Sequence, residues 1–88
     1  MDISFPPETL PMLSHSGTLV FIALKDGVRK IPCGISFEAL IERFGAKAMD
    51  THALCLAFKG NRSTIHRKAS EALALNGGHS VLLMREHF

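Results

Sequence analysis

The stretch that decides the fold runs from Asp50 to Asn76 and reads DTHALCLAFKGNRSTIHRKASEALALN. Apolar side chains recur in it at spacings of three and four residues, which places them on one side of a helix with 3.6 residues per turn. This apolar stripe, with one polar member inside the run, consists of Leu54, Phe58, Asn61, Ile65, Ala69, Ala72 and Asn76. The other side carries Lys59, Ser63, His66, Arg67 and Ser70. We therefore predict a long amphipathic helix over residues 51–76, with any function on its polar side or at its ends.

Gly60 is the weak point of this predicted helix. A glycine inside a helix costs about 1 kcal/mol relative to alanine, so the chain has the alternative of two shorter helices that divide there. The apolar stripe keeps its phase across Gly60, and this favours one continuous helix. Asp50 is placed to cap its start, and Asn76 followed by two glycines ends it.

A β-hairpin precedes the helical part of the chain. Residues 18–24 are apolar on both alternating faces and rich in strand formers. The pair Asp26 and Gly27 separates them from a second strand-like run, which indicates a tight hairpin over residues 18–33. A further strand is expected over residues 80–85, and the sequence allows a short N-terminal strand near residues 10–13.

A short helix over residues 37–44 follows the hairpin. Ser36 is placed to cap its start, and Gly45 supplies the left-handed residue that commonly ends a helix. Its apolar stripe consists of Phe37, Leu40, Ile41 and Phe44. The chain is thus predicted to be one α+β domain over residues 1–88, with two layers: a small antiparallel sheet packed on a short helix and a long helix.

Composition restricts the class of protein. The chain has 88 residues, which is enough for one core, and 47% of them are hydrophobic. So much apolar surface on a small domain favours a homodimer or a protein partner. The net charge is only +2, no stretch is long and apolar enough for a membrane span, and the N-terminus lacks the pattern of a signal peptide. We expect a cytoplasmic protein without a membrane partner.

The order and separation of several short motifs resemble those of a small bacterial family, domain-of-unknown-function family 1488. The resemblance covers nearly the whole chain. It rests on Phe21 to Ala23 leading to Asp26-Gly27, Ile35-Ser36 with Glu38-Ala39-Leu40, Phe44-Gly45-Ala46, Ala57-Phe58 with Asn61-Arg62, Ile65, Ala69, and Val81-Leu82-Leu83 with Phe88. It implies a fold and a bacterial, cytoplasmic setting, and it implies no activity.

Arg62 is the polar residue of greatest interest. It lies beside Asn61 at the margin of the apolar stripe, where a guanidinium can make a forked contact to a carboxylate or a phosphate. The structural alternative is that Arg62 pairs with an acid such as Glu38 or Glu42, or caps free carbonyls, and so ties the helix to the sheet. A concave pocket that holds Arg62 together with a histidine would instead favour a catalytic or ligand-binding cleft.

A basic helix face is the second candidate site. It consists of Lys59, Arg62, His66 and Arg67, and cations of this kind neutralise phosphates. Four charges spread over half the helix circumference are more often a solvated surface, and no aromatic residue is interleaved to stack on bases. Nucleic-acid binding is therefore the alternative function.

Neither metal nor catalytic chemistry is indicated. The five histidines and the two cysteines lack the spacing of a metal site, and we expect Cys33 and Cys55 to be free, buried thiols in a reducing compartment. No paired carboxylates, nucleophile motif or phosphate-binding loop is present, so we expect no cofactor and no enzymatic activity. The sequence favours a small interaction or structural module that acts through a homodimer or a partner surface.

Overall fold

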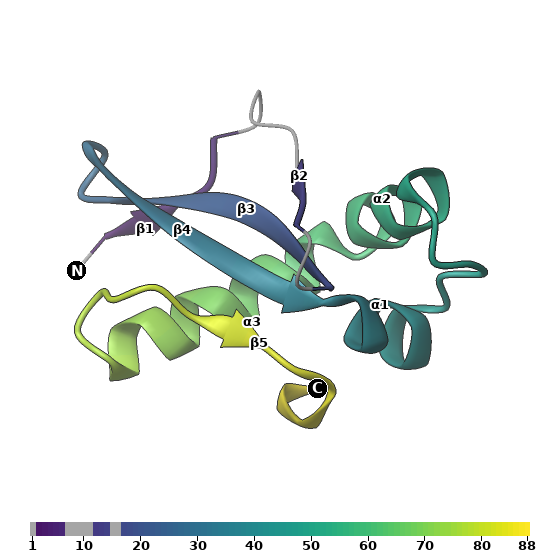
Figure 1. The fold of residues 1–88 in the computed structure, drawn as a ribbon. Helices are drawn as coiled ribbons and strands as arrows, with labels where there is room; N and C mark the ends of the chain where they lie inside the picture. Colours follow the sequence, from purple (N-terminus) through teal and green to yellow (C-terminus); the bar gives the residue numbers. More distant parts are fainter. Residues whose placement is uncertain (1, 7–11, 15–16) are drawn as a thin grey trace.

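A hairpin of two long strands forms the centre of the sheet (Figure 1). The computed structural model describes residues 2–6, 12–14 and 17–88. In it β3 (Thr18–Lys25) and β4 (Arg29–Ser36) pair antiparallel over all 8 residues. The turn between them is tight because Asp26 and Gly27 both have positive φ angles, 53° and 75°, which match the twist of paired strands. The predicted hairpin is confirmed, and β4 extends further than expected.

Two short strands pair with the edge of β3 that faces away from β4. They are β1 (Ile3–Ser4) and β2 (Met12–Leu13), and both run antiparallel to β3. β2 agrees with the strand that the sequence allows near residues 10–13, of which residues 10 and 11 lie outside the described part. β1 was not predicted as a strand, because it has only two residues and prolines follow it at positions 6, 7 and 11.

The last strand differs from the prediction in direction and length. β5 (Leu82–Leu83) pairs with β4 in parallel, so the sheet is mixed, and the expected antiparallel arrangement of residues 80–85 is wrong. The chain reaches β5 from β4 through helices, and a crossover of that kind joins parallel strands. The strand stops early because a 3₁₀ turn, η1 (Arg85–His87), follows it, with the Met84 amide donating to His87 Nδ1 at 2.8 Å.

The short helix begins and ends where the sequence predicts. α1 (Phe37–Phe44) starts after Ser36, whose Oγ accepts a hydrogen bond from the Ala39 amide at 3.1 Å. Gly45 ends it in the left-handed conformation, with φ 72°, and its amide donates to the carbonyl of Leu40. Both terminal residues therefore satisfy backbone groups that the helix leaves unpaired.

The expected helix over residues 51–76 is two helices, which corrects the prediction. α2 (Thr51–Gly60) and α3 (Arg62–Leu75) meet at Asn61. The Asn61 amide donates to the Phe58 carbonyl at 3.2 Å, and the Asn61 side-chain Nδ2 donates to the Ala57 carbonyl at 2.8 Å. Short polar side chains compete with the helical backbone in this way, and Gly60 beside it is a poor helix former. The alternative of two shorter helices that divide at Gly60 is therefore correct, with Gly60 as the last residue of α2.

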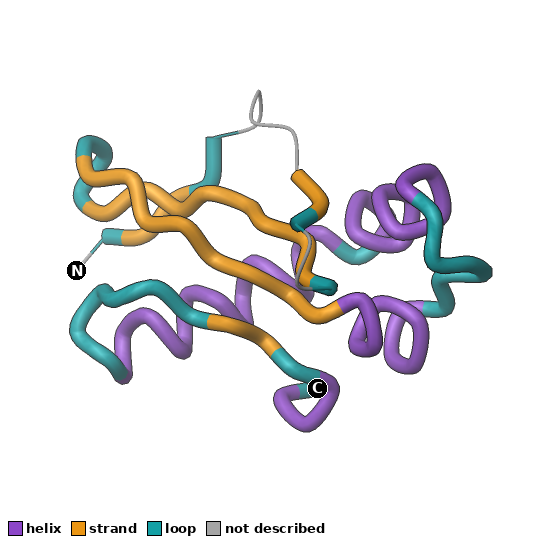
Figure 2. Tube along the Cα trace, viewed as in Figure 1, coloured by secondary structure: helices purple, strands orange, loops and turns teal. Residues whose placement is uncertain are grey.

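The helices and the sheet enclose one core, and the predicted two-layer α+β fold is confirmed (Figure 2). α3 runs along one face of the hairpin, while α1 and α2 lie beyond one end of the sheet (Figure 1). Of the predicted stripe, Leu54, Phe58, Ile65 and Ala69 are buried. Ala72 is only half-buried, Leu73 is buried in its neighbourhood, and Asn76 is exposed.

The break between α2 and α3 leads to a prediction about two glycines. A β-carbon added at Gly60 or at Gly45 would meet no heavy atom within 4 Å, so only the backbone conformation distinguishes the two sites. Gly60→Ala is expected to raise the free energy of unfolding by about 0.5 to 1 kcal/mol, because Gly60 is helical and alanine orders more easily. Gly45→Ala is expected to lower it by about 1 to 2 kcal/mol, because φ there is positive. Urea unfolding followed by circular dichroism measures both, and shifts of the same sign would contradict this account.

Candidate functional site

Asn61 is a structural residue at the junction of α2 and α3. It ends α2 and precedes α3, and its side chain binds the Ala57 carbonyl rather than capping α3. The polarity that Asn61 introduces into the apolar stripe is thus explained by the helix break. Its neighbour Arg62 has a different environment.

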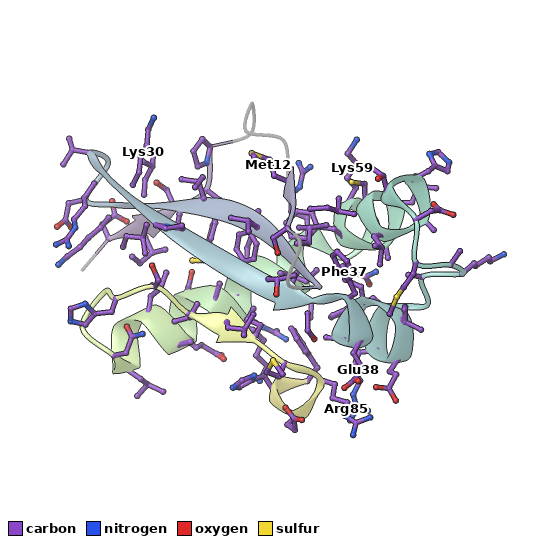
Figure 3. The ribbon with its side chains drawn as sticks, in the orientation of Figure 1. Met12, Lys30, Phe37, Glu38, Lys59 and Arg85 are labelled. Carbon is purple, nitrogen blue, oxygen red and sulfur yellow. The ribbon has the colours of Figure 1, made fainter. Side chains whose placement is uncertain are left out.

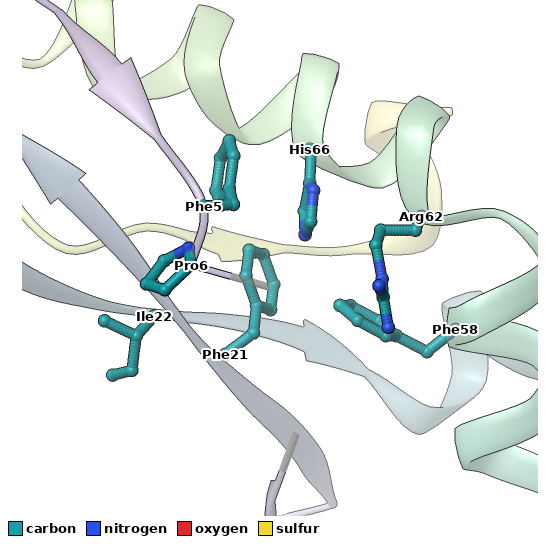
Figure 4. A pocket seen from close by; sticks show the side chains of 7 residues that line it. All are labelled: Phe5, Pro6, Phe21, Ile22, Phe58, Arg62 and His66. Carbon is teal, nitrogen blue, oxygen red and sulfur yellow. The ribbon is translucent and has the colours of Figure 1, made fainter. Parts of the chain in front are cut away.

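Arg62 and His66 lie together at the start of α3 and line a pocket (Figure 4). They are four residues apart, so their side chains leave the same face of the helix. The remaining walls are apolar and come from β3, α2 and the N-terminal segment: Phe5, Pro6, Phe21, Ile22 and Phe58. The cavity has a volume of about 110 Å³, which is enough for a small molecule.

The His66 ring is packed among three phenylalanines. It stacks on Phe5 with ring centroids 3.9 Å apart and an angle of 5° between the planes. Phe21 lies 5.8 Å and Phe58 5.9 Å from it, again between centroids. The expectation that His66 is a solvent-facing basic residue is therefore wrong. Phe5, far away in the sequence, covers it.

Of the two polar residues that line the pocket, Arg62 is charged at pH 7 and His66 is neutral. Burial, and to a smaller extent the nearby Arg62 charge, lowers the pKa of His66 from 6.5 to about 4, so the ring is neutral at pH 7. Among the described residues, no acidic side chain forms an ion pair with Arg62. One guanidinium thus faces a largely apolar cavity beside a neutral ring that has both a donor and an acceptor nitrogen.

The expected ion pair of Arg62 with Glu38 or Glu42 is not formed. Both glutamates bind Arg85 instead, as Figure 3 shows for Glu38. The Nη1 of Arg85 lies 3.0 and 2.9 Å from the two carboxylate oxygens of Glu42, and its Nε lies 3.3 Å from Glu38 Oε1. These contacts raise the pKa of Arg85 further above its ordinary value. The sequence prediction failed because η1 brings Arg85 back onto α1.

The other two basic candidates lie outside the pocket. Lys59 and Arg67 are exposed, and Figure 3 shows Lys59 pointing away from the body of the fold. Lys59 belongs to α2 and Arg67 to α3, so the break divides the predicted basic face between two helices. With His66 neutral, the expected set of four cations does not form one continuous charged face.

The cysteines and potential metal ligands do not form a second site in the described part of the chain. No group of three or more His, Cys, Asp or Glu side chains there is placed to hold a metal ion. Cys33 is free and buried, its Sγ donates to the Ile31 carbonyl at 3.7 Å, and burial raises its pKa. Cys55 is free but only half-buried, which corrects the expectation for that thiol.

Sequence reasoning missed the aromatic walls of the pocket. Phe58 was expected only as a member of the apolar stripe, and neither Phe5 nor Phe21 was predicted to contact His66. Phe5 and Pro6 form an apolar pair near the N-terminus, but the spacing of residues on α3 alone cannot show which distant side chain covers His66.

Comparison with known proteins gives one match. A family model described as protein of unknown function (DUF1488) matches residues 3–83. Neither a curated protein nor a solved structure matches the chain. Within residues 2–6, 12–14 and 17–88, no helix has the length and apolar character needed to cross a bilayer.

The packing of His66 predicts a pH-dependent stability. The pKa of His66 is about 4 in the folded protein, whereas the ordinary value for histidine is 6.5. Between pH 6.5 and pH 4 His66 is therefore protonated in the unfolded chain but still neutral in the folded protein. The free energy of unfolding therefore decreases from pH 6.5 to pH 4, by on the order of 1 to 2 kcal/mol after allowance for solvent screening of a half-buried group.

His66→Phe keeps an aromatic ring against Phe5 and removes the titration. Urea unfolding at pH 7 and pH 4 should therefore show a smaller loss of stability for His66→Phe than for the unsubstituted protein. His79→Phe, at an exposed histidine after α3, serves as the control and should behave like the unsubstituted protein. Equal losses in all three proteins would show that His66 is not held neutral by packing.

Proposed function

The chain belongs to the DUF1488 family of proteins of unknown function. From the pocket of this family member we propose a function. The protein is a small, non-enzymatic binding module for an organic carboxylate. The carboxylate lies between Arg62 and His66, and its apolar part contacts the phenylalanine walls. The observation that carries the proposal is the half-buried Arg62, which lines an apolar cavity and has no ion-pair partner among the described residues. Leaving such a charge unpaired in apolar surroundings is unfavourable, and a bound anion relieves that cost.

The local electrostatics support an anion. Arg62 is the first residue of α3, and the N-terminus of a helix carries a partial positive charge that adds to the guanidinium. A guanidinium offers two parallel donors that match the two oxygens of a carboxylate. The neutral His66 ring can donate one further hydrogen bond, because one of its nitrogens keeps its proton.

The pocket walls favour a carboxylate with an apolar body over inorganic phosphate. Five of the seven lining residues are apolar, and a fully hydrated phosphate would have to lose water against them without replacement hydrogen bonds. A cavity of about 110 Å³ limits the apolar body to a short chain or a single ring. Benzoate is a suitable probe because it combines one ring with one carboxylate.

The proposed setting is the cytoplasm of a bacterium. The two cysteines are free although the fold is small, and a reducing compartment keeps thiols in that state. The bacterial assignment comes from the resemblance described above.

Benzoate titration tests the proposed function. Chemical-shift changes in ¹⁵N-labelled protein are expected to concentrate at pocket residues and to saturate by about 50 mM benzoate, since so small a ligand binds with a Kd on the order of 1 mM. Arg62→Gln should weaken binding about 10-fold or more, because a hydrogen bond to a charged group contributes about 1.5 to 3 kcal/mol. Acetate should bind more weakly than benzoate, and inorganic phosphate should leave the pocket resonances unchanged.

Arg67→Gln is the matched control, because it removes the same charge from the same helix outside the pocket. Its benzoate affinity should stay within about twofold of that of the unsubstituted protein, since exposed charges are screened. An equal loss in both variants would indicate general attraction of anions rather than a site. Tighter binding of phosphate than of benzoate would exclude the proposed ligand class.

A further inference from the structure

The edge of β3 that faces β1 and β2 contains a gap. β1 pairs with β3 at Leu24 and Lys25. β2 pairs with β3 at Leu19 and Val20, so the two short strands lie at separate places along this edge (Figure 1). Ile22 lies in the middle of the interval between them, and in the described part of the chain no strand pairs with it on this side. The backbone groups that Ile22 directs to this side therefore lack the partners that a longer β1 or β2 would supply.

The main chain of Ile22 points into this gap. In antiparallel strands, successive residues direct their N–H and C=O groups alternately to the two sides of the strand. The even-numbered positions of β3 point towards β1 and β2, because the Ser14 amide donates to the Thr18 carbonyl at 2.9 Å. In the same way, the Asp26 amide donates to the Asp2 carbonyl at 2.7 Å. Ile22 is four residues from Thr18 and four from Asp26, so its N–H and C=O point to the same side.

The gap opens into the pocket that Arg62 and His66 line. Ile22 lines the same pocket and is half-buried. Side chains alternate between the two faces of a strand, and the buried Phe21 and Ala23 assign the neighbours of Ile22 to the α3 side. The Ile22 side chain is therefore on the opposite face, and Figure 4 shows it directed away from Arg62 and His66. What Ile22 presents to the pocket is its main chain, with one donor and one acceptor.

Pro6 keeps the Ile22 carbonyl unpaired by β1. The pairing of Ser4 with Leu24 sets the register of β1 on β3, and two residues further along this register Pro6 lies opposite Ile22. Pro6 also lines the pocket. Because proline has no N–H, it cannot donate to the Ile22 carbonyl and extend the strand. The sequence thus ends β1 at the point where the pocket begins.

We propose that the ligand of this pocket is an N-acyl amino acid, whose carboxylate binds Arg62 and whose N–H donates to the Ile22 carbonyl. This inference rests on the proposed carboxylate site and narrows its ligand class. An N-acyl amino acid carries its N–H one carbon away from its carboxylate, so one small cavity can bind both groups. The Ile22 amide donates to a carboxylate oxygen, and the ligand and Ile22 then exchange two N–H···O bonds as paired residues of antiparallel strands do.

The size of the gap favours a free small molecule over the C-terminus of a peptide. Val20 is already paired with β2 and Leu24 with β1, so Ile22 is the one position between them that directs its backbone groups to this side. A peptide would find no second open position at which to pair its next residue. The cavity of about 110 Å³ is also small, so we expect a ligand with a single amino-acid unit and a short acyl group.

A matched pair of ligands tests the proposal. N-acetylglycine and 4-oxopentanoate differ only in that a CH₂ group replaces the N–H, so both carry the carboxylate for Arg62. In titrations of ¹⁵N-labelled protein, N-acetylglycine should bind about 3- to 10-fold more tightly, because one hydrogen bond is added. The Ile22 amide should exchange rapidly with deuterium in the ligand-free protein and more slowly with N-acetylglycine bound. The amides of Phe21 and Ala23, which face β4, are the controls and should exchange slowly in both states.

The outcomes separate this inference from the carboxylate site on which it rests. Equal affinities for N-acetylglycine and 4-oxopentanoate, together with binding of benzoate, would overturn the N-acyl amino acid and leave the carboxylate site intact. No binding of benzoate or of either probe would overturn both. Slow exchange of the Ile22 amide in the ligand-free protein would show that the gap is closed and would overturn the inference. N-acetyltriglycine that binds about 10-fold more tightly than N-acetylglycine would exclude the free small molecule in favour of a peptide C-terminus.

Discussion

The turn of the chain at Asn61 is the constraint on which the rest of the structure depends. The segment between β4 and β5 occupies two places in the fold. Its helix α2 packs against α1 beyond the end of the sheet, and its helix α3 covers the inner face of the hairpin. A straight helix over residues 51–76 cannot occupy both. Gly60 lowers the cost of a break, and Asn61 satisfies the carbonyl of Ala57 that the break would otherwise leave unpaired.

This turn also produces the pocket. It places Arg62 and His66 in the first two turns of α3, under the N-terminal segment that follows β1. There Phe5 stacks on the His66 ring, and the half-buried ring is kept neutral by its burial and by the adjacent guanidinium. A cation and a neutral imidazole in an apolar cavity are the basis of the proposed carboxylate site.

Local chemistry made part of the fold predictable. The hairpin follows from Asp26 and Gly27, which accept positive φ, and the limits of α1 follow from Ser36 and Gly45. The sequence offered a helix break at Gly60 as an alternative, but the phase of the apolar stripe favoured one continuous helix. The buried residues of α2 and α3 keep the same spacing in the sequence although the axes of the two helices diverge, so the spacing does not reveal the break. The direction of β5 and the contact of Phe5 with His66 depend on residues distant in the sequence, which spacing cannot reveal.

Titration of His66 by NMR, with and without benzoate, tests the central claim most directly. In the free protein we expect a pKa near 4 for this ring. A carboxylate bound beside Arg62 offsets the guanidinium charge and accepts a hydrogen bond from the protonated ring, so benzoate should raise the pKa of His66. A pKa near 6.5 in the free protein, or one that benzoate leaves unchanged, would contradict the account.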